Sequence, residues 1–390
     1  MSIPIPTIQL KQGKEASLRR KHPWVFSGAV ASVNQIPEDG QWVRVVDAKG
    51  QFLGQGHFHE GSICVRIIDF KDNVVDADFW VNRLQKAWNS RMNMGLIDNT
   101  STNIFRWVHG EGDGLPGLII DVYDNVAVLQ PHSHGMLRNA KDIADAMQKV
   151  GRDWKAIYVK PAEKNGDQEP YYALGSKVEI QAQEWDLKYS IDWETGQKTG
   201  FFIDQRENRK LLGKYSKGKK VLNTFCYSGG FSLTALQAGA IHVDSLDSSQ
   251  SALDLTLINV ALNGYGEDKH AVIKADAVEY IKTVGSDYDV IVLDPPAFAK
   301  HLSAKHKAVQ GYRKINEAAI RKIKSGGILF TFSCSQAVDK DTFKGAILAA
   351  AIDSGREVKI LHQLHQPEDH PISLFHPEGE YLKGLVLEIN

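Results

Sequence analysis

From residue 219 onward, short apolar segments alternate with longer segments that have helical spacing. The apolar segments VLNTFC, HVDSLD, AVIKAD, YDVIVLD and GILFTFSC are separated by predicted helices of about ten to fifteen residues. This spacing favours right-handed crossovers between parallel strands. The later segments EVKILHQL and GLVLEI are expected to add an antiparallel edge. The pattern therefore predicts a doubly wound α/β sheet.

The preceding residues follow two other patterns. Residues 1–75 contain short strands separated by glycine-containing turns without an intervening helix, which is typical of a small β-barrel. Residues 76–190 begin with a helical connector and continue as an α+β module with an antiparallel sheet, in which the polar stretch 163–170 is expected to be a loop. With the α/β part at 191–390, the sequence predicts three domains, as expected for 390 residues.

Composition narrows the class of protein. The 46 Lys and Arg residues and the 47 Asp and Glu residues nearly cancel, so any basic surface must be local. Cys64, Cys226 and Cys334 are far apart and lack metal-ligand spacing, which argues against a disulfide framework or a zinc site. No apolar run could span a bilayer, and no leader pattern opens the chain. We expect a cytoplasmic protein with no metal site and no membrane partner.

Glycines and carboxylates stand at the predicted ends of four strands. Gly229 and Gly230 follow the first strand, where glycine permits close approach of a ligand to the backbone. Asp247 ends the second strand about 20 residues later, where a carboxylate can accept two ribose hydroxyls. Asp276, placed for an adenine edge, and Asp294 end the third and fourth strands. Because ligands of open parallel sheets bind beyond the carboxyl ends of strands, these residues predict a cofactor site.

The first turn, CYSGGFS, distinguishes between two cofactors. A dinucleotide needs the G-x-G-x-x-G cradle for its pyrophosphate, and this turn lacks it. S-adenosylmethionine has no phosphate and needs no such cradle. We therefore predict S-adenosylmethionine, with Tyr227 and Ala277 as further contacts. For the glycine pair alone, an ordinary loop is the alternative.

Asp294 opens a DPP turn. Both following prolines have a fixed φ and no N–H, so the turn is rigid and aims the carboxylate into the crevice. Methyltransferases that act on planar nitrogen-bearing groups use this kind of turn, although a plain strand terminator is the alternative. Phe298 is a candidate to stack on a flipped base, and packing is an equally good interpretation.

Cys334, between two serines at the fifth strand end, is the candidate nucleophile. Addition of a thiolate to carbon 6 of cytosine makes carbon 5 electron-rich enough to accept a methyl group, which divides one hard step into easier ones. Asp294 would stabilise the adduct by protonation of, or a hydrogen bond to, the ring nitrogen, and for that step the acid must be protonated or must bind the exocyclic amine. The alternative for Cys334 is a small buried hydrophobe, a common role of free cysteine.

Several long motifs in the same order resemble the ribosomal RNA large subunit methyltransferase I family. They are HPWVFSGAV, similar to the opening of its PUA domain, HGEGDGLPGLIIDVY, similar to its central domain, and GQKTGFFIDQRENR, LNTFCYSGGFS, LDPPAFAK, FTFSCS and HPEGEYLKGL, similar to its catalytic domain. The resemblance implies a C-terminal class I Rossmann-like methyltransferase domain, an N-terminal PUA-like β-barrel and a central α+β domain. It implies S-adenosylmethionine as methyl donor and a 23S rRNA cytosine as substrate. It matches Cys334 to the nucleophile and Asp294 to the base-facing acid.

Two positions depart from related enzymes. Asn223 stands where many methyltransferases have Asp, so no cofactor contact is assigned to it. The fourth-strand turn reads PPA and lacks the second cysteine of many RNA cytosine-5 enzymes, so the base that removes the carbon 5 proton is unassigned. The segment 196–209 is expected to close over the cofactor through Lys198, Asp204 and Gln205, with helix capping as the alternative.

A basic run precedes the HPW motif of the predicted barrel. Lys11, Arg19, Arg20 and Lys21 lie near Trp24, and phosphate contacts with added stacking are typical of RNA binding. A solvated charged face is the alternative. The expected partner is 23S rRNA or a large-subunit assembly intermediate, and a homodimer is compatible with the sequence. Rival functions are methylation of a base nitrogen without a covalent intermediate and an RNA chaperone that has lost catalysis.

Overall fold

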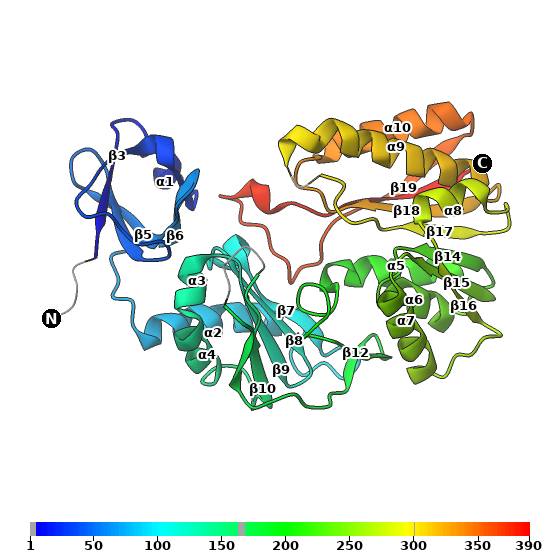
Figure 1. Cartoon of the computed structure of the whole chain (residues 1–390), viewed down its shortest axis with the longest axis horizontal. Coiled ribbons are helices and arrows are strands. Elements are labelled where there is room, and N and C mark those ends of the chain that lie inside the picture. Colours follow the sequence, from blue (N-terminus) through cyan, green and yellow to red (C-terminus); the bar gives the residue numbers. More distant parts are fainter. Residues whose placement is uncertain (1–4, 163–167, 300) are drawn as a thin grey trace. The chain divides into compact units, whose positions relative to one another are not determined.

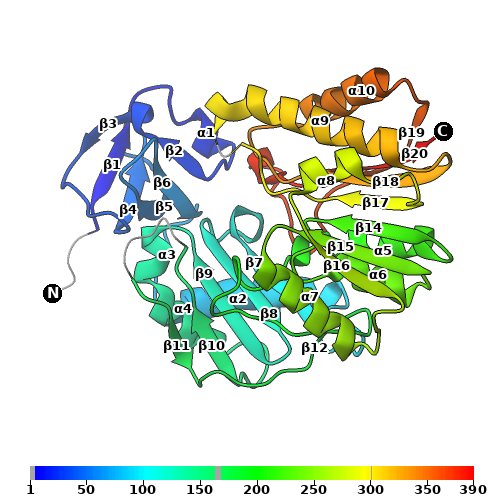
Figure 2. The ribbon, with the colours of Figure 1, turned by 45° about the vertical axis from the view of Figure 1, so that its right-hand side comes forward.

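The computed structural model describes residues 5–162, 168–299 and 301–390, so the start of the predicted loop at 163–170 lies outside the described residues. The chain divides into two compact units (Figures 1 and 2). Unit 1 comprises Met1–Ala182, Ile191–Phe201 and Glu368–Gly379, and unit 2 comprises Gln183–Ser190, Phe202–Pro367 and Glu380–Asn390. The predicted division into three domains stays a prediction. Within the described ranges, no helix is both long and apolar enough to cross a membrane.

The first sheet of unit 1 has six strands in the order β2-β6-β5-β4-β1-β3. They are β1 (Thr7–Leu10), β2 (Trp24–Phe26), β3 (Val30–Val33), β4 (Trp42–Val46), β5 (Phe52–Phe58) and β6 (Ile63–Asp69). Alternate side chains such as Ile8, Val43 and Val65 form its core, together with Cys64. The expectation of a helix-free segment was wrong at one point, because the basic run contains the short helix α1 (Ala16–Arg19).

The second sheet of unit 1 has the order β11-β10-β9-β8-β7. Its strands are β7 (Ile104–His109), β8 (Leu118–Tyr123), β9 (Val126–Pro131), β10 (Ala156–Val159) and β11 (Tyr171–Leu174). The same part of the chain contains the helices α2 (Ala77–Asn93), α3 (His134–Arg138) and α4 (Ala140–Met147). The prediction of a wholly antiparallel sheet was wrong, because β9 and β10 pair in parallel. The helices α3 and α4 lie between these strands in the sequence and provide the crossover that a parallel pair requires.

The large sheet of unit 2 has the order β16-β15-β14-β17-β18-β20-β19. Its strands are β14 (Lys220–Thr224), β15 (His242–Asp247), β16 (His270–Lys274), β17 (Val290–Leu293), β18 (Gly327–Ser333), β19 (Val358–Leu364) and β20 (Lys383–Ile389). The first five pair in parallel, and β20 pairs antiparallel with both β18 and β19. The predicted doubly wound sheet and its antiparallel edge are confirmed. A separate hairpin joins β12 (Ala182–Glu184) to β13 (Leu187–Tyr189).

The strand order of unit 2 reverses at β14. From β14 the chain moves outward to β15 and β16, then returns to the other side of β14 for β17 and β18. Right-handed crossovers therefore place α6 (Gly230–Gln237) and α7 (Gln250–Leu262) on one face, and α8 (Ala277–Thr283) and α9 (Lys305–Lys322) on the other (Figure 2). The helices α8, α9 and α10 (Lys340–Ser354) share one apolar core with the sheet. The helix α5 (Arg206–Ser216) precedes β14 and contacts α6.

The strand register determines which residues lie side by side at the carboxyl edge of this sheet. Thr224 of β14 lies beside Leu246 of β15 and Leu293 of β17. The next residues along these strands, Asp247 and Asp294, therefore emerge at the same carboxyl edge. A crevice at this switch point is where doubly wound sheets bind their ligands.

Candidate active site

The turn between β14 and α6 has an unusual backbone. Phe225, Tyr227 and Gly229 all have positive φ, at 56°, 47° and 78°. The neighbouring elements hold this shape: the amide of Cys226 donates to the carbonyl of Leu246 at 3.1 Å, and the Thr256 hydroxyl of α7 donates to the carbonyl of Tyr227 at 2.9 Å. Tertiary hydrogen bonds therefore offset the cost of left-handed conformations at two non-glycine residues.

Gly229 and Gly230 are required by packing inside unit 2. A Cβ on Gly229 would lie 2.9 Å from Cγ2 of Thr256, and a Cβ on Gly230 would lie 2.9 Å from Cδ of Arg209. Arg209 cannot move aside easily, because both oxygens of the buried Glu184 accept from it at 2.6 Å. Packing thus gives a reason for both glycines that the sequence did not show, and the expected approach of a ligand to their backbone stays a prediction.

Asp247 has the geometry of a ribose acceptor. Its two oxygens accept from the amides of Tyr227 at 3.2 Å and Ser249 at 2.9 Å, which fixes the carboxylate. A carboxylate offers about four lone-pair positions, so each oxygen keeps capacity for one hydroxyl. A carboxylate with this remaining accepting capacity fits the ribose of S-adenosylmethionine. Asp276 caps α8 by accepting from the amide of Glu279 at 3.0 Å, which leaves its adenine contact and that of the adjacent, buried Ala277 as predictions.

A residue just before α5, Gln205, contacts Asp294, the acid that follows β17. The Gln205 amide donates to Oδ1 of Asp294 at 3.0 Å, and the Gln205 carbonyl oxygen accepts from Asn208 at 2.7 Å. Asn208 therefore fixes which end of the Gln205 side-chain amide faces the acid. Asp204 accepts from the Tyr381 hydroxyl at 2.8 Å. Lys198 belongs to unit 1, and its cofactor contact stays a prediction.

Cys334 follows directly after β18 and is partly exposed. The two adjacent serines anchor it: Ser333 donates to the Tyr312 hydroxyl at 2.9 Å, and Ser335 donates to the carbonyl of Ala299 at 2.7 Å. Burial raises the pKa of Tyr312 to about 12, and the charges of Cys334 and Asp294 add to this effect. The thiol and the acid thus share one neighbourhood around the Tyr312 hydroxyl.

Two further residues frame this neighbourhood. The Phe298 ring lies 4.7 Å from the Tyr312 ring, so packing accounts for Phe298 and its contact with a base stays a prediction. Lys383 opens β20 opposite Ser333 and is only 3% exposed. Its Nζ donates to the carbonyl of Ser335 at 2.6 Å. Burial lowers the pKa of Lys383 to about 8, while the nearby Cys334 opposes that shift.

The sequence contained no local signal for Lys383, because it lies 49 positions after Cys334 and only strand pairing brings the two segments together. Asn223 was also set aside. Its Nδ2 donates to Ser232 at 2.9 Å, and its buried Oδ1 has no hydrogen-bond partner within the described residues. An acceptor of this kind, at the strand that opens the cofactor turn, would be expected to bind a donor group.

Comparison with known proteins adds an independent line of support. A model of PUA-like domains matches residues 8–70, and a model of S-adenosylmethionine-dependent methyltransferases matches residues 170–377. Ribosomal RNA large subunit methyltransferase I of Alteromonas mediterranea is 39% identical over 390 residues, covering 97% of this chain and 98% of that protein. The protein of the same name from Shewanella denitrificans is 40% identical, covering 98% and 99%. The chain belongs to the ribosomal RNA large subunit methyltransferase I family.

The predicted fold and cofactor are confirmed with this family assignment. The crystal structure of SMU.776, a methyltransferase complexed with SAH, aligns with a TM-score of 0.86 over 99% of this chain and 100% of that one. At 21% identity this likeness shows a common fold alone. The methyltransferase match identifies the unit 2 sheet as an S-adenosylmethionine-dependent domain, and the PUA-like match covers the barrel.

In this member of the family, most of the predicted RNA-binding residues also have partners within unit 1. Lys11 donates to the carbonyl of Gly28 at 3.0 Å, and Arg19 pairs with Asp47 at 2.8 Å. Lys21 lies over the Phe70 ring at 4.7 Å. Arg20 is exposed beside them at the end of α1. All four cations are exposed on a nearly neutral chain, and RNA binding by them stays a prediction.

Trp24 is less available than its motif suggested. Its Nε1 donates to Glu111 at 2.9 Å, and its ring lies 4.4 Å from that of His376. His22, His376 and Glu378 offer ligand atoms within 4.8 Å of one another. However, Nδ1 of His22 accepts from the Trp24 amide at 3.2 Å, so Nε2 of His22 carries the proton that faces Glu378 at 3.4 Å. This geometry supports a hydrogen-bonded pair and opposes metal ligation by His22.

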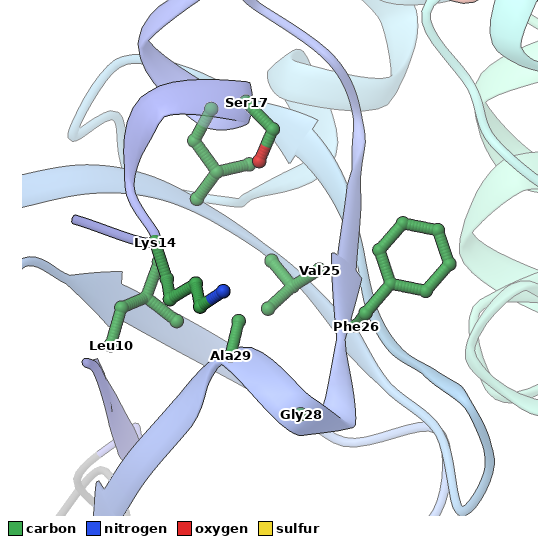
Figure 3. A pocket seen from close by; sticks show the side chains of 8 residues that line it. Leu10, Lys14, Ser17, Val25, Phe26, Gly28 and Ala29 are labelled. Atoms are coloured by element: carbon green, nitrogen blue, oxygen red, sulfur yellow. The ribbon is translucent and has the colours of Figure 1, made fainter. Parts of the chain in front are cut away.

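A cavity of about 350 Å³ opens on the barrel between α1 and β2 (Figure 3). Lys14 and Ser17 supply polar atoms, and the Phe26 ring is 50% exposed. The remaining lining residues are Leu10, Leu18, Val25, Gly28 and Ala29. Sequence analysis missed Ser17 and Phe26, although Phe26 belongs to the quoted HPWVFSGAV motif. The cavity thus combines a cation and a hydroxyl with apolar side chains, and the Phe26 ring points away from the other labelled side chains (Figure 3).

Proposed function

We propose that the protein methylates carbon 5 of a cytosine in large-subunit ribosomal RNA, through a covalent adduct of Cys334 with carbon 6. One observation carries this proposal: a partly exposed thiol and an acid at neighbouring strand ends share the environment of Tyr312. The relatives named ribosomal RNA large subunit methyltransferase I support the substrate class. When bound, S-adenosylmethionine supplies the methyl group that carbon 5 accepts.

Residues of the cofactor side hold the donor. Asp247 accepts the two ribose hydroxyls, while the backbone of Tyr227, Gly229 and Gly230 lines the methionine end. Asp276 and Ala277 contact the adenine from the start of α8. Lys198, Asp204 and Gln205 close the site from the segment before α5, and Gln205 also holds Asp294.

The Cys334 thiolate starts the reaction by forming a bond to carbon 6 of the ring. The electron pair of the carbon 5–carbon 6 double bond moves into the ring, and carbon 5 becomes nucleophilic. Asp294, oriented by the hydrogen bond from the Gln205 amide, accepts a hydrogen bond from the exocyclic amine and orients the base. After methylation, a base takes the carbon 5 proton, the electron pair of that C–H bond restores the double bond, and the bond between sulfur and carbon 6 breaks to release the thiolate. The same thiol therefore adds and leaves.

The PUA-like barrel supplies RNA affinity in this proposal. Its predicted contacts are Lys11, Arg19, Arg20, Lys21 and Trp24, and the cavity beside Lys14 and Phe26 offers a place for an unstacked base. Phe298 stacks on the target base. The substrate is 23S rRNA, either naked or in an assembly intermediate, and cytoplasmic action follows from such a substrate. Assays on deproteinised rRNA and on subunit precursors separate the two forms, and sedimentation tests for the homodimer that the sequence allows.

The decisive experiment is methylation of undermodified rRNA with a tritiated methyl donor, followed by mapping of the labelled nucleotide. We expect label on carbon 5 of one cytosine. RNA that contains 5-fluorocytosine should form a covalent complex with the protein, because the missing carbon 5 proton blocks release of the thiolate. Label on a base nitrogen, with full activity of Cys334→Ala, would instead establish the non-covalent alternative. Absence of S-adenosylmethionine binding would contradict both.

A further inference from the structure

We propose that Lys383 is the cation that keeps Cys334 in its thiolate form. The inference rests on the proposed function, because it explains how the attacking thiol is activated. Lys383 acts through Cys334 and is a positioning residue that need not touch the base. Reactive cysteines require such a neighbour, since the thiolate is the nucleophile and cations favour it.

The geometry fixes the Lys383 ammonium beside the thiol segment. Antiparallel pairing places Lys383 opposite Ser333, and its Nζ donates to the carbonyl of Ser335 at 2.6 Å. These contacts lie on either side of Cys334 in the chain. Lys383 is 3% exposed, so water screens its charge weakly. A buried charge without a partner is costly, which makes a nearby thiolate a favourable counter-ion.

Other charged groups near Lys383 are already engaged. Asp339 pairs with Lys305 at 2.8 Å, and Glu380 pairs with Lys340 at 3.0 Å. Among the described residues Lys383 forms no ion pair, and of the charges that raise its pKa that of Cys334 has the largest effect, ahead of Glu380 and Asp339. Cys334 and Asp294 both act on the Tyr312 hydroxyl through their charge, so a thiolate at Cys334 would lie in the neighbourhood of a second acid. Lys383 is the cation placed to offset that acid.

The proton balance of this activation is simple. Burial lowers the pKa of Lys383 to about 8, so its neutral amine is accessible near physiological pH. Transfer of one proton from Sγ of Cys334 to Nζ of Lys383 breaks the S–H bond, forms an N–H bond and leaves a thiolate beside an ammonium. No other atom changes. When the thiolate then bonds to carbon 6, its negative charge passes into the ring and Lys383 remains protonated.

The test measures alkylation of Cys334 by iodoacetamide as a function of pH, in the full chain without donor or RNA, with mass spectrometry of the Cys334 peptide. Lys383→Met removes the charge and the hydrogen bond to Ser335, whereas Lys383→Gln removes the charge and keeps an amide donor. Lys383→Arg keeps both. Lys340→Met is the matched control, because Lys340 is a nearby cation that pairs with Glu380.

We expect the pH midpoint of alkylation to rise by about one unit in the Met and Gln variants, and to stay within about 0.3 unit in the Arg and control variants. At pH 6.5 the rate should fall by roughly threefold, since a tenfold loss of thiolate is partly offset by its greater nucleophilicity. Equal midpoints in wild type and both neutral variants would overturn the inference. The proposed function would survive that result if Cys334→Ala still abolished methylation, so the two failures are distinguishable.

Discussion

At the carboxyl ends of β14 and β15 hydrogen bonds to Asp247 and between backbone groups fasten a turn, whereas at the ends of β17 and β18 an acid and a thiol lie near Tyr312. Each half contains one cysteine, which allows a direct comparison. Cys226 is buried at 6% exposure next to Thr256, and burial raises its pKa to about 12. Cys334 is partly exposed and has Lys383 beside its chain segment. The same side chain is thus a packing element in one half and a candidate nucleophile in the other.

This difference suggests how one sheet edge can serve two purposes. A donor such as S-adenosylmethionine needs a fixed surface of hydrogen-bonding atoms, and a strained turn fastened by its neighbours provides one. Attack on a nucleobase needs protein groups whose charge can change during the reaction. Buried side chains with shifted pKa values provide such groups. The predictions below test this contrast, beginning with the largest expected effect.

Replacement of Cys334 by Ala should lower methylation by about a thousandfold or more, because no other group would form the covalent adduct. The affinity for S-adenosylhomocysteine, measured by calorimetry, should stay within about twofold, since the donor is held by the other half. Cys226→Ala is the matched control and should still be trapped by RNA containing 5-fluorocytosine. If Cys226 formed the covalent complex, or if Cys334→Ala remained active, Cys334 would not be the nucleophile.

Asp247→Ala should weaken binding of S-adenosylhomocysteine by roughly 30-fold, the equivalent of about 2 kcal/mol for charge-assisted hydrogen bonds to two hydroxyls. The alkylation rate of Cys334 should not change, because Asp247 belongs to the other half. Asp254→Ala on the exposed side of α7 serves as the control. Affinity within twofold of wild type would mean that the backbone alone holds the donor.

Gly229→Ala should destabilise the protein by about 2 kcal/mol. The new methyl would both adopt a φ of 78° and lie 2.9 Å from Thr256. Gly264→Ala has nearly the same φ of 79° but nothing within 4 Å, so it should cost about 1 kcal/mol from the backbone alone. Urea unfolding of both variants separates clash from strain. Equal losses would show that α7 yields to the methyl group.

The smallest effect concerns pH and stability. The pKa of Lys383 is lowered in the folded protein to about 8 from an ordinary 10.5. Between these values the unfolded chain binds more protons, so this group makes folding more favourable as pH rises. The stability of wild type relative to Lys383→Met should therefore increase by roughly 1.3 kcal/mol from pH 7 to pH 9. A constant difference, measured by urea unfolding, would indicate an ordinary lysine.

Residues at the strand ends could be predicted from the sequence, whereas contacts between distant segments could not, for a physical reason. Asp247, Asp294 and Cys334 end apolar strands, and parallel strands place their carboxyl ends at one edge, so local pattern sufficed to predict them. The role of Gln205 in holding Asp294 depends on a contact between residues 89 positions apart. Lys383 depends on β20 inserting beside β18, which a run of apolar residues does not specify. The reason for Gly229 likewise lies in Thr256 of another helix.

The insertion of β20 between β18 and β19 has a consequence for the synthesis of the protein. A nascent chain that has reached residue 382 has made β18, β19 and Cys334, but it lacks the strand that joins them. Two open strand edges then await a partner, and such edges attract chaperones or aggregate. Lys383 is the first residue of the missing strand. When β20 pairs with β18 and β19, the sheet closes and Lys383 comes to lie beside the Cys334 segment in the same late step. A chain that ends before residue 383 would therefore have neither.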